Sequence, residues 1–144
     1  MAEFRIERAS ALPPEEAWRR LTRWEMHAAQ VPLTRISVVT PGPNGVGTRF
    51  VARTGVGAAG FDDPMEVVRW EPPQSGRPGF CELEKQGRVV LGRAGIEVRP
   101  EGSGCRVVWC EELRIARLPG VFDSLTARSG QLLFGRAVAG LLRD

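Results

Sequence analysis

The chain has 144 residues, a length typical of one domain with a full hydrophobic core, and its 42% apolar and 26% charged residues are ordinary for a globular protein. The formal net charge is +3, but the arginines alternate with acids and form no basic block, which argues against nucleic-acid binding. No apolar run is long enough for stable membrane insertion, and MAEFRIERAS lacks the apolar core of a signal peptide. We therefore expect a single cytoplasmic domain over residues 1–144.

The first elements are a short strand and two short helices. Phe4–Ala9 alternates between two faces, which predicts a strand. Two prolines followed by two acids then open a helix at Pro13, because a first helical turn tolerates proline and favours negative charge. Ala17, Trp18, Leu21 and Trp24 have the spacing of one buried helical face. A second short helix is predicted over residues 24–29.

The middle of the chain contains only strands and turns. Runs of alternating polar and apolar residues are separated by clusters rich in proline and glycine, and such short connections imply an antiparallel sheet. The predicted strands cover residues 35–38, 48–53, 61–70, 80–86, 88–99 and 105–115.

The longest predicted helix is the last element, Pro119–Leu142. Its apolar residues form two stripes that are rotated relative to each other, and Ser129-Gly130 between them is typical of a kink. We therefore expect a helix whose two halves point in slightly different directions and which buries much of its circumference against a curved surface. The first stripe consists of Leu118, Val121, Phe122, Leu125 and Leu132, and the second of Leu133, Phe134, Ala137, Val138 and Leu141.

Strands in a run with helices segregated to the two ends indicate an α+β domain. The order and spacing of FRIERAS, PPEEAWRRLTRWE, GVGTRFVART, FDDPMEVVRWEPP, CRVVWCEEL and the closing helix resemble the START-like superfamily. Within it the chain is most similar to the polyketide cyclase/dehydrase and lipid-transport family. The resemblance implies a helix-grip fold, in which a curved antiparallel sheet of about six or seven strands wraps around a long C-terminal helix. It also implies an apolar ligand in a cavity between them, with two short helices after the first strand closing one end.

The walls of this cavity are expected to be the inward-facing residues of the strands and of the last helix, and the alternative is that they form a filled core. The predicted ligand-binding residues are Phe50, Met65, Val67, Leu83, Lys85, Val107, Trp109, Glu111, Phe122, Leu125 and Leu133.

Three polar residues are candidates for chemistry inside the cavity. The alternation of its strand points Glu111 inward, where it could bind a ligand hydroxyl or act as a general acid or base. The alternatives are a strand end in solvent or a pair with an arginine. Lys85 could face the cavity and pair with Glu111, or extend into water. His27, the only histidine, is a catalytic candidate at the cavity mouth or a packing residue.

Cofactor and metal sites are not expected. The three cysteines have no metal-ligand spacing, and Cys105 and Cys110 lie on opposite faces of one strand and cannot easily pair. Residues 55–60 match the letters GxGxxG, but a strand follows them, whereas dinucleotide binding requires a helix there.

Three hypotheses for function follow. The first is a binding protein for a small hydrophobic molecule, lipid-like, polyketide-like or aromatic. The second is a cyclase or dehydratase that uses Glu111 and His27. The third is a protein-interaction module of the same fold, which predicts a filled interior and an exposed apolar patch. The sequence leaves a homodimer open.

Overall fold

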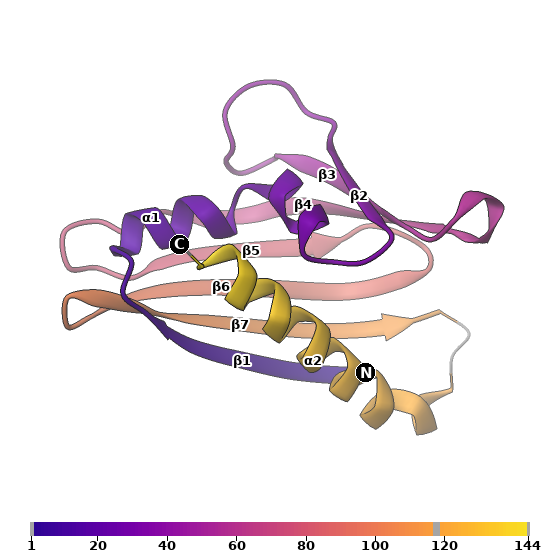
Figure 1. Cartoon of the computed structure of the whole chain (residues 1–144). Coiled ribbons are helices and arrows are strands. Elements are labelled where there is room, and N and C mark those ends of the chain that lie inside the picture. The colour runs from indigo at the N-terminus through magenta and orange to yellow at the C-terminus, as the bar shows by residue number, and fades with distance from the viewer. Residues whose placement is uncertain (1, 117–118, 144) are drawn as a thin grey trace.

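The computed structural model describes residues 2–116 and 119–143. Its strands form one antiparallel sheet in the order β1-β7-β6-β5-β4-β3-β2, so that only β1 joins a strand distant in sequence (Figure 1). The seven strands of this sheet are β1 (Ala2–Ser10), β2 (Thr34–Val38), β3 (Arg49–Thr54), β4 (Phe61–Glu71), β5 (Gly79–Lys85), β6 (Val90–Glu101) and β7 (Gly104–Ile115).

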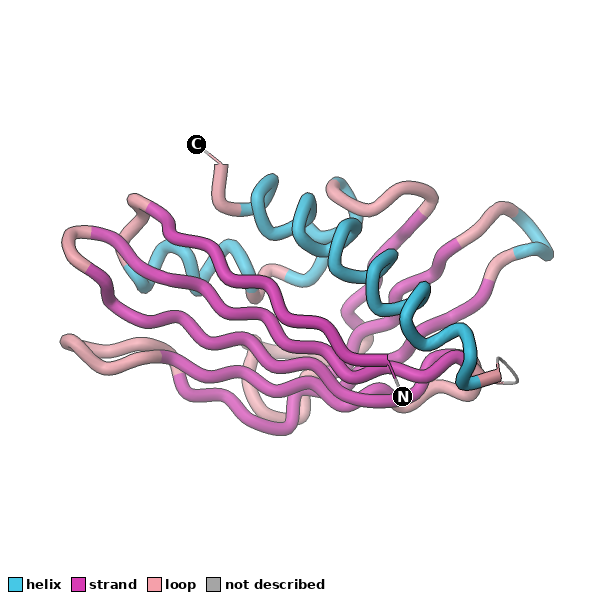
Figure 2. Tube along the Cα trace, turned by 90° about the horizontal axis from the view of Figure 1, so that it is seen from below, coloured by secondary structure: helices cyan, strands magenta, loops and turns pink. Residues whose placement is uncertain are grey.

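The helices α1 (Pro14–Leu21) and α2 (Asp123–Leu141) cover the same face of this sheet (Figure 2). A 3-10 segment, Trp24–Ala29, follows α1, and two single turns occur at Gly57–Ala59 and Gly120–Phe122. The structure confirms the α+β helix-grip architecture, including the two short helical segments after the first strand. No helix in the described part of the chain is both long and apolar enough to span a membrane.

The alternation of apolar side chains determines which face of the sheet is buried. On β5, Gly79, Cys81, Leu83 and Lys85 are buried, whereas Glu82 and Glu84 between them are exposed. Predicted and observed strands agree to within about two residues at each end, the usual uncertainty of strand boundaries. Cys105 is buried and Cys110 exposed, as predicted from their opposite faces.

The last helix differs from the prediction in where it is buried. Its C-terminal half packs against β1 and α1, and Ala137, Val138 and Leu141 are buried there. Of the stripe predicted to be buried in its first half, four residues are exposed and Leu118 lies outside the described residues. The exposed fractions are 81% for Val121, 43% for Phe122, 63% for Leu125 and 60% for Leu132.

The prediction that the last helix buries much of its circumference is therefore wrong for its first half. Helical periodicity shows which residues share a face, but it does not show whether another element packs on that face, and these four residues remain exposed. The helix also begins at Asp123 rather than Pro119, after the 3-10 turn, and continues through Ser129-Gly130 as a single element. Gly130 allows α2 to approach β1, because a side chain there would overlap the ring of Phe4.

Candidate functional site

A cavity of about 450 Å³ lies between the inner face of the sheet and the first half of α2. Its walls are mainly apolar and include stacked aromatic rings. Phe134 stacks on Trp109 with ring centroids 5.6 Å apart, and Phe50 stacks on Trp24 at 4.7 Å. Such a volume and lining are typical of a site for one small organic molecule.

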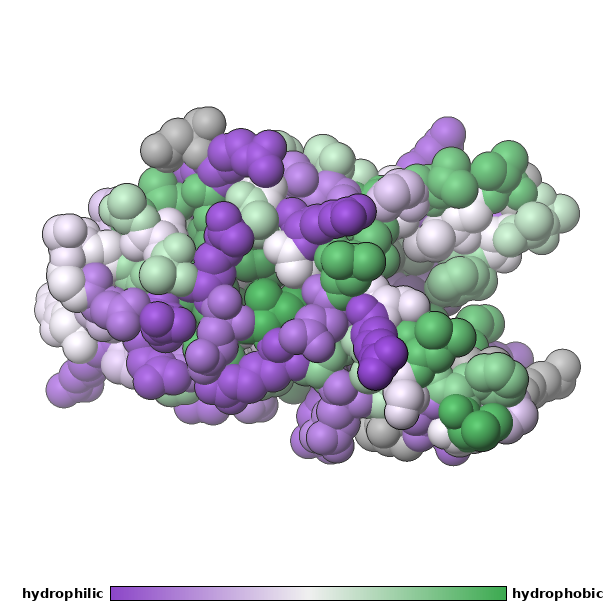
Figure 3. Space-filling model, turned by 60° about the horizontal axis from the view of Figure 1, so that its bottom comes forward, coloured by the Kyte–Doolittle hydropathy of each residue, from purple (hydrophilic) through white to green (hydrophobic). Residues whose placement is uncertain are grey.

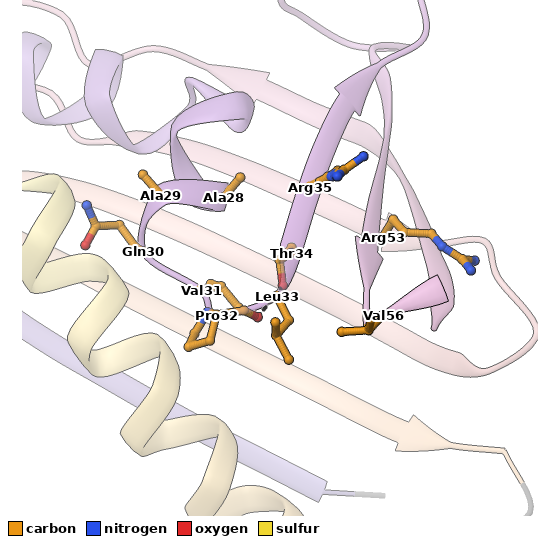
Figure 4. A pocket seen from close by; sticks show the side chains of 11 residues that line it. Ala28, Ala29, Gln30, Val31, Pro32, Leu33, Thr34, Arg35, Arg53 and Val56 are labelled. Atoms are coloured by element: carbon orange, nitrogen blue, oxygen red, sulfur yellow. Dashed lines mark hydrogen bonds between the residues drawn. The ribbon is translucent and has the colours of Figure 1, made fainter. Parts of the chain in front are cut away.

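The cavity opens between α2 and the strands β2 and β3. Figure 3 shows a cleft on this side of the molecule, with hydrophobic side chains on both of its walls. Phe61 and Leu125 line the cavity while remaining 37% and 63% exposed, so they belong to its rim. A neighbouring hollow of about 760 Å³ lies between residues 28–35 and the loop that contains Gly55 and Val56 (Figure 4). Val31 and Thr34 line both spaces, so the hollow adjoins the cavity mouth.

Three charged side chains meet in the cavity wall. The ammonium group of Lys85 lies 2.9 Å from Oδ2 of Asp63 and 3.2 Å from Oε1 of Glu111. Trp109 Nε1–H donates a hydrogen bond of 3.2 Å to Oε2 of Glu111. The Lys85 and Glu111 side chains are only 4% and 3% exposed. This charge cluster of Asp63, Lys85 and Glu111 is the main polar feature of the cavity.

Small residues on β6 make the Lys85–Glu111 pair possible. Lys85 is on β5 and Glu111 on β7, with β6 between them, so the two backbones are roughly 10 Å apart. Ala94 pairs with Glu111 and Gly92 with Leu113, and these inward positions carry only a methyl group and a hydrogen. The long lysine side chain therefore crosses β6 over the space that larger side chains would fill.

The two carboxylates keep Lys85 protonated. Burial by itself lowers the pKa of Lys85, but the attraction of Glu111 and Asp63 outweighs it, and the pKa is raised above its ordinary value of 10.5. One oxygen of Asp63, Oδ1, is fully buried and accepts no hydrogen bond from the described residues. The cluster therefore combines one cation, two carboxylates and one unused acceptor.

His27 lines the cavity but is held by the backbone. Its side chain is buried, and its Nε2–H donates a 2.7 Å hydrogen bond to the carbonyl of Leu21. The imidazole lies between Trp24 and Trp109, with centroid distances of 5.9 and 5.7 Å. Burial lowers its pKa below 6.5, so the ring is neutral at pH 7.

Nine of the residues proposed from the sequence lie in the cavity wall, and three do not. Val67 and Val107 point to the inner face but are fully buried in the core. Phe122 lies in the turn before α2 and is partly exposed. The nine in the wall are His27, Phe50, Met65, Leu83, Lys85, Trp109, Glu111, Leu125 and Leu133.

Sequence reasoning missed Asp63, although a signal was present. Asp63 lies two residues before Met65 on β4, and Met65 was assigned to the inner face, so both side chains share that face. Other wall residues that were not predicted include Thr34, Thr54, Phe61, Ser129 and Phe134.

No group of three or more histidine, cysteine or acidic residues in the described ranges could hold a metal ion. The cysteines are unpaired, and burial raises the pKa of Cys81 to about 12, so its thiol is not reactive at neutral pH.

The family model described as polyketide cyclase / dehydrase and lipid transport matches residues 1–143. The chain belongs to this family. No protein with a curated description matches the sequence.

Solved structures share the fold at low identity. A STAR-related lipid transfer protein from Xanthomonas axonopodis is 14% identical, with a TM-score of 0.72 over 99% of this chain and 86% of that one. The Zhui aromatase/cyclase from Streptomyces sp. R1128 is 12% identical, with a TM-score of 0.66 over 96% and 91%. A START superfamily protein from Mycobacterium smegmatis is 12% identical, with a TM-score of 0.72 over 99% and 97%. The family and fold are consistent with hydrophobic ligand binding or with cyclase activity.

Proposed function

We propose that the protein binds one small hydrophobic molecule, lipid-like, polyketide-like or aromatic, in the cavity between the sheet and α2. The observation that carries this proposal is the cavity itself, an apolar space of about 450 Å³ with an opening to solvent. Each 100 Å² of apolar ligand surface removed from water contributes about 2.5 kcal/mol before the costs of association. The aromatic rings of Phe50, Trp109 and Phe134 provide flat contact surfaces for such a molecule.

Native mass spectrometry of the protein purified from its own host tests the proposal. A co-purifying small molecule that dissociates on activation is the expected result. The filled-cavity variant Ala94→Leu should lose it, because Ala94 lines the cavity and its methyl lies between Leu83 and Glu111. The control is Gly95→Leu on the next residue, where an added Cβ meets nothing within 4 Å. Equal retention of the molecule by both variants would place its binding site elsewhere.

The charge cluster also favours a second candidate, a cyclase or dehydratase. Glu111 and Lys85 lie in a water-poor wall, where a carboxylate and an ammonium group can hold or move a proton next to a bound chain. His27 suits this role less, because its Nε2–H is already used by Leu21. Loss of turnover in Glu111→Gln with unchanged ligand affinity would support the enzyme, whereas binding by the unmodified protein without any turnover would support binding alone.

The cavity weighs against the third hypothesis, a protein-interaction module, which predicted a filled interior. We expect the protein in the cytoplasm, and both a monomer and a homodimer are compatible with the proposal. Fluorescence imaging of a tagged chain and light scattering of the purified protein test these two points.

A further inference from the structure

A groove between β1 and α2 brings together three arginines from two distant parts of the sequence. It has a volume of about 580 Å³ and shares no lining residue with the cavity. Arg8 comes from β1, and Arg128 and Arg136 come from α2. All three are exposed, and none has a hydrogen-bond or ion-pair partner among the described residues. The acid in the described wall, Glu7, pairs with two arginines outside the groove, so the groove carries unpaired positive charge.

The side chains that α2 contributes to the groove have a regular spacing. Arg128, Leu132 and Arg136 are four residues apart, so they lie above one another on one face of the helix. A rise of 1.5 Å per residue separates the two arginines by about 12 Å. Leu132 between them is 60% exposed, and Gly135 beside it has open space at its Cβ. The helix therefore offers two positive charges at a fixed distance, with an apolar surface between them.

The other wall of the groove is an edge of the sheet. β1 pairs only with β7, so the backbone groups on its other side have no strand partner in the part of the chain that the structure describes. α2 packs against this edge strand (Figure 1). An unpaired edge can take up an extended peptide as an additional strand, which main-chain hydrogen bonds then hold.

The spacing of side chains on such an added strand matches that of α2. Residues i, i+2 and i+4 of a strand point to the same face, and a rise of about 3.3 Å per residue places residues i and i+4 about 13 Å apart. Acidic residues at i and i+4 would therefore face Arg128 and Arg136, and an apolar residue at i+2 would face Leu132. Single-stranded nucleic acid fits the groove less well, because the described wall contains no aromatic ring on which a base could stack.

We propose that this groove binds an extended segment of a partner protein as an additional strand beside β1, and that the segment has acidic residues at positions i and i+4 with an apolar residue at i+2. The free charge of Arg8 adds to the attraction from the strand side. This interaction goes beyond ligand binding in the cavity and does not depend on it, because the two sites have no lining residue in common.

Fluorescence anisotropy of labelled peptides with the whole protein at pH 7 tests the inference. The probe is the peptide TTETLTETT, which has the proposed spacing, and the control is TTEELTTTT, which has the same composition but places its two acids on opposite faces of a strand. We expect the first peptide to bind about tenfold or more tightly. Equal affinities, binding of neither peptide, or tighter binding of oligothymidylate or of phosphatidylglycerol vesicles would overturn the inference.

Modified peptides test whether the segment adds as a strand. Two versions of TTETLTETT are N-methylated at alternate amides, one version in each register. One of them should lose binding, because its blocked amides face β1, and the other should keep it. Equal binding by both versions would contradict strand addition.

Exposed arginines provide the matched protein variants. Arg128→Gln and Arg136→Gln should each weaken binding about two- to fivefold, and the double variant about tenfold or more, because each removes one exposed ion pair. The control is Arg93→Gln, which removes a 78% exposed guanidinium on β6 outside the groove and should leave the affinity unchanged. An equal loss in all variants would show only a general effect of net charge and would contradict the inference. Thermal melting reports whether each variant folds, and the peptide comparison on the unmodified protein decides the matter if one does not.

Discussion

Removing the ammonium group of Lys85 should destabilise the protein strongly. Lys85→Met keeps the length and volume of the side chain but leaves Asp63 and Glu111 as buried carboxylates without a cation. At an effective dielectric constant of about 20, each contact near 3 Å corresponds to about 5 kcal/mol of attraction, most of which is cancelled by the cost of desolvating the ions. Removal of one partner from a buried ion pair typically costs about 3–5 kcal/mol, and we expect that loss at pH 7.

Urea unfolding followed by tryptophan fluorescence measures this change in the free energy of unfolding. Arg93→Met is the matched control, because the Arg93 side chain is 78% exposed and lies 3.9 Å from a partly exposed Glu112; it should cost less than about 1 kcal/mol. A loss below about 1 kcal/mol at pH 7, no larger than that of Arg93→Met, would refute the argument that the cluster is buried and mutually dependent.

The pH dependence of stability gives a second test of the same group. Because the pKa of Lys85 is raised in the folded protein, its contribution is complete below the ordinary value of 10.5 and is lost as the pH rises through the folded value. The unmodified protein should therefore lose stability in this alkaline range, and Lys85→Met should lack that step.

Three further predictions concern other residues. Burial lowers the pKa of His27 in the folded protein, so the unfolded chain binds a proton at a higher pH than the folded protein does. The stability of the folded protein should therefore fall as the pH drops below 6.5. Thermal melts of His27→Gln should lack this loss. Gly92 has a φ of +130°, and a side chain there would overlap the carbonyl of Glu112. Gly92→Ala should therefore lower the free energy of unfolding in urea by about 2 kcal/mol or more. The control Gly95→Ala, which has open space at the Cβ, should lower it by less than about 1 kcal/mol. Leu125→Ser should weaken binding of an apolar probe such as 2-(2-naphthyl)ethanol several-fold, because Leu125 is part of the cavity rim. The control Leu132→Ser changes a similarly exposed leucine outside the cavity and should leave binding unchanged. Both variants should change the free energy of unfolding by about 0.5 kcal/mol or less.

The sequence predicts the inner face of the sheet well, because side chains on a strand alternate with a period of two. Trp109 and Glu111 were assigned to that face by alternation alone, and both line the cavity. Alternation does not show how far along a strand the cavity extends. Val67 and Val107 have the correct face but are buried in the filled part of the core and do not line the cavity.

The charge cluster shows a different limit. Lys85 and Glu111 are separated by a whole strand, and their contact depends on the register of β5, β6 and β7 and on the small residues at Gly92 and Ala94. A single sequence contains the residue types but not this register. The Lys85–Glu111 pair could therefore be proposed only as one alternative, and the third member of the charge cluster, Asp63, was missed.

The two halves of α2 have different roles, one in folding and the other at the cavity. The second half is anchored in the interior through Ala137, Val138 and Leu141, while the first half borders the cavity and contributes few buried residues. Substitutions at positions such as Leu125, Thr126 and Ser129 therefore face weak constraint from folding, although they shape the entrance for a guest. Family members could diversify what they admit by varying this short stretch alone, and grafting it between relatives is a direct route to engineered selectivity.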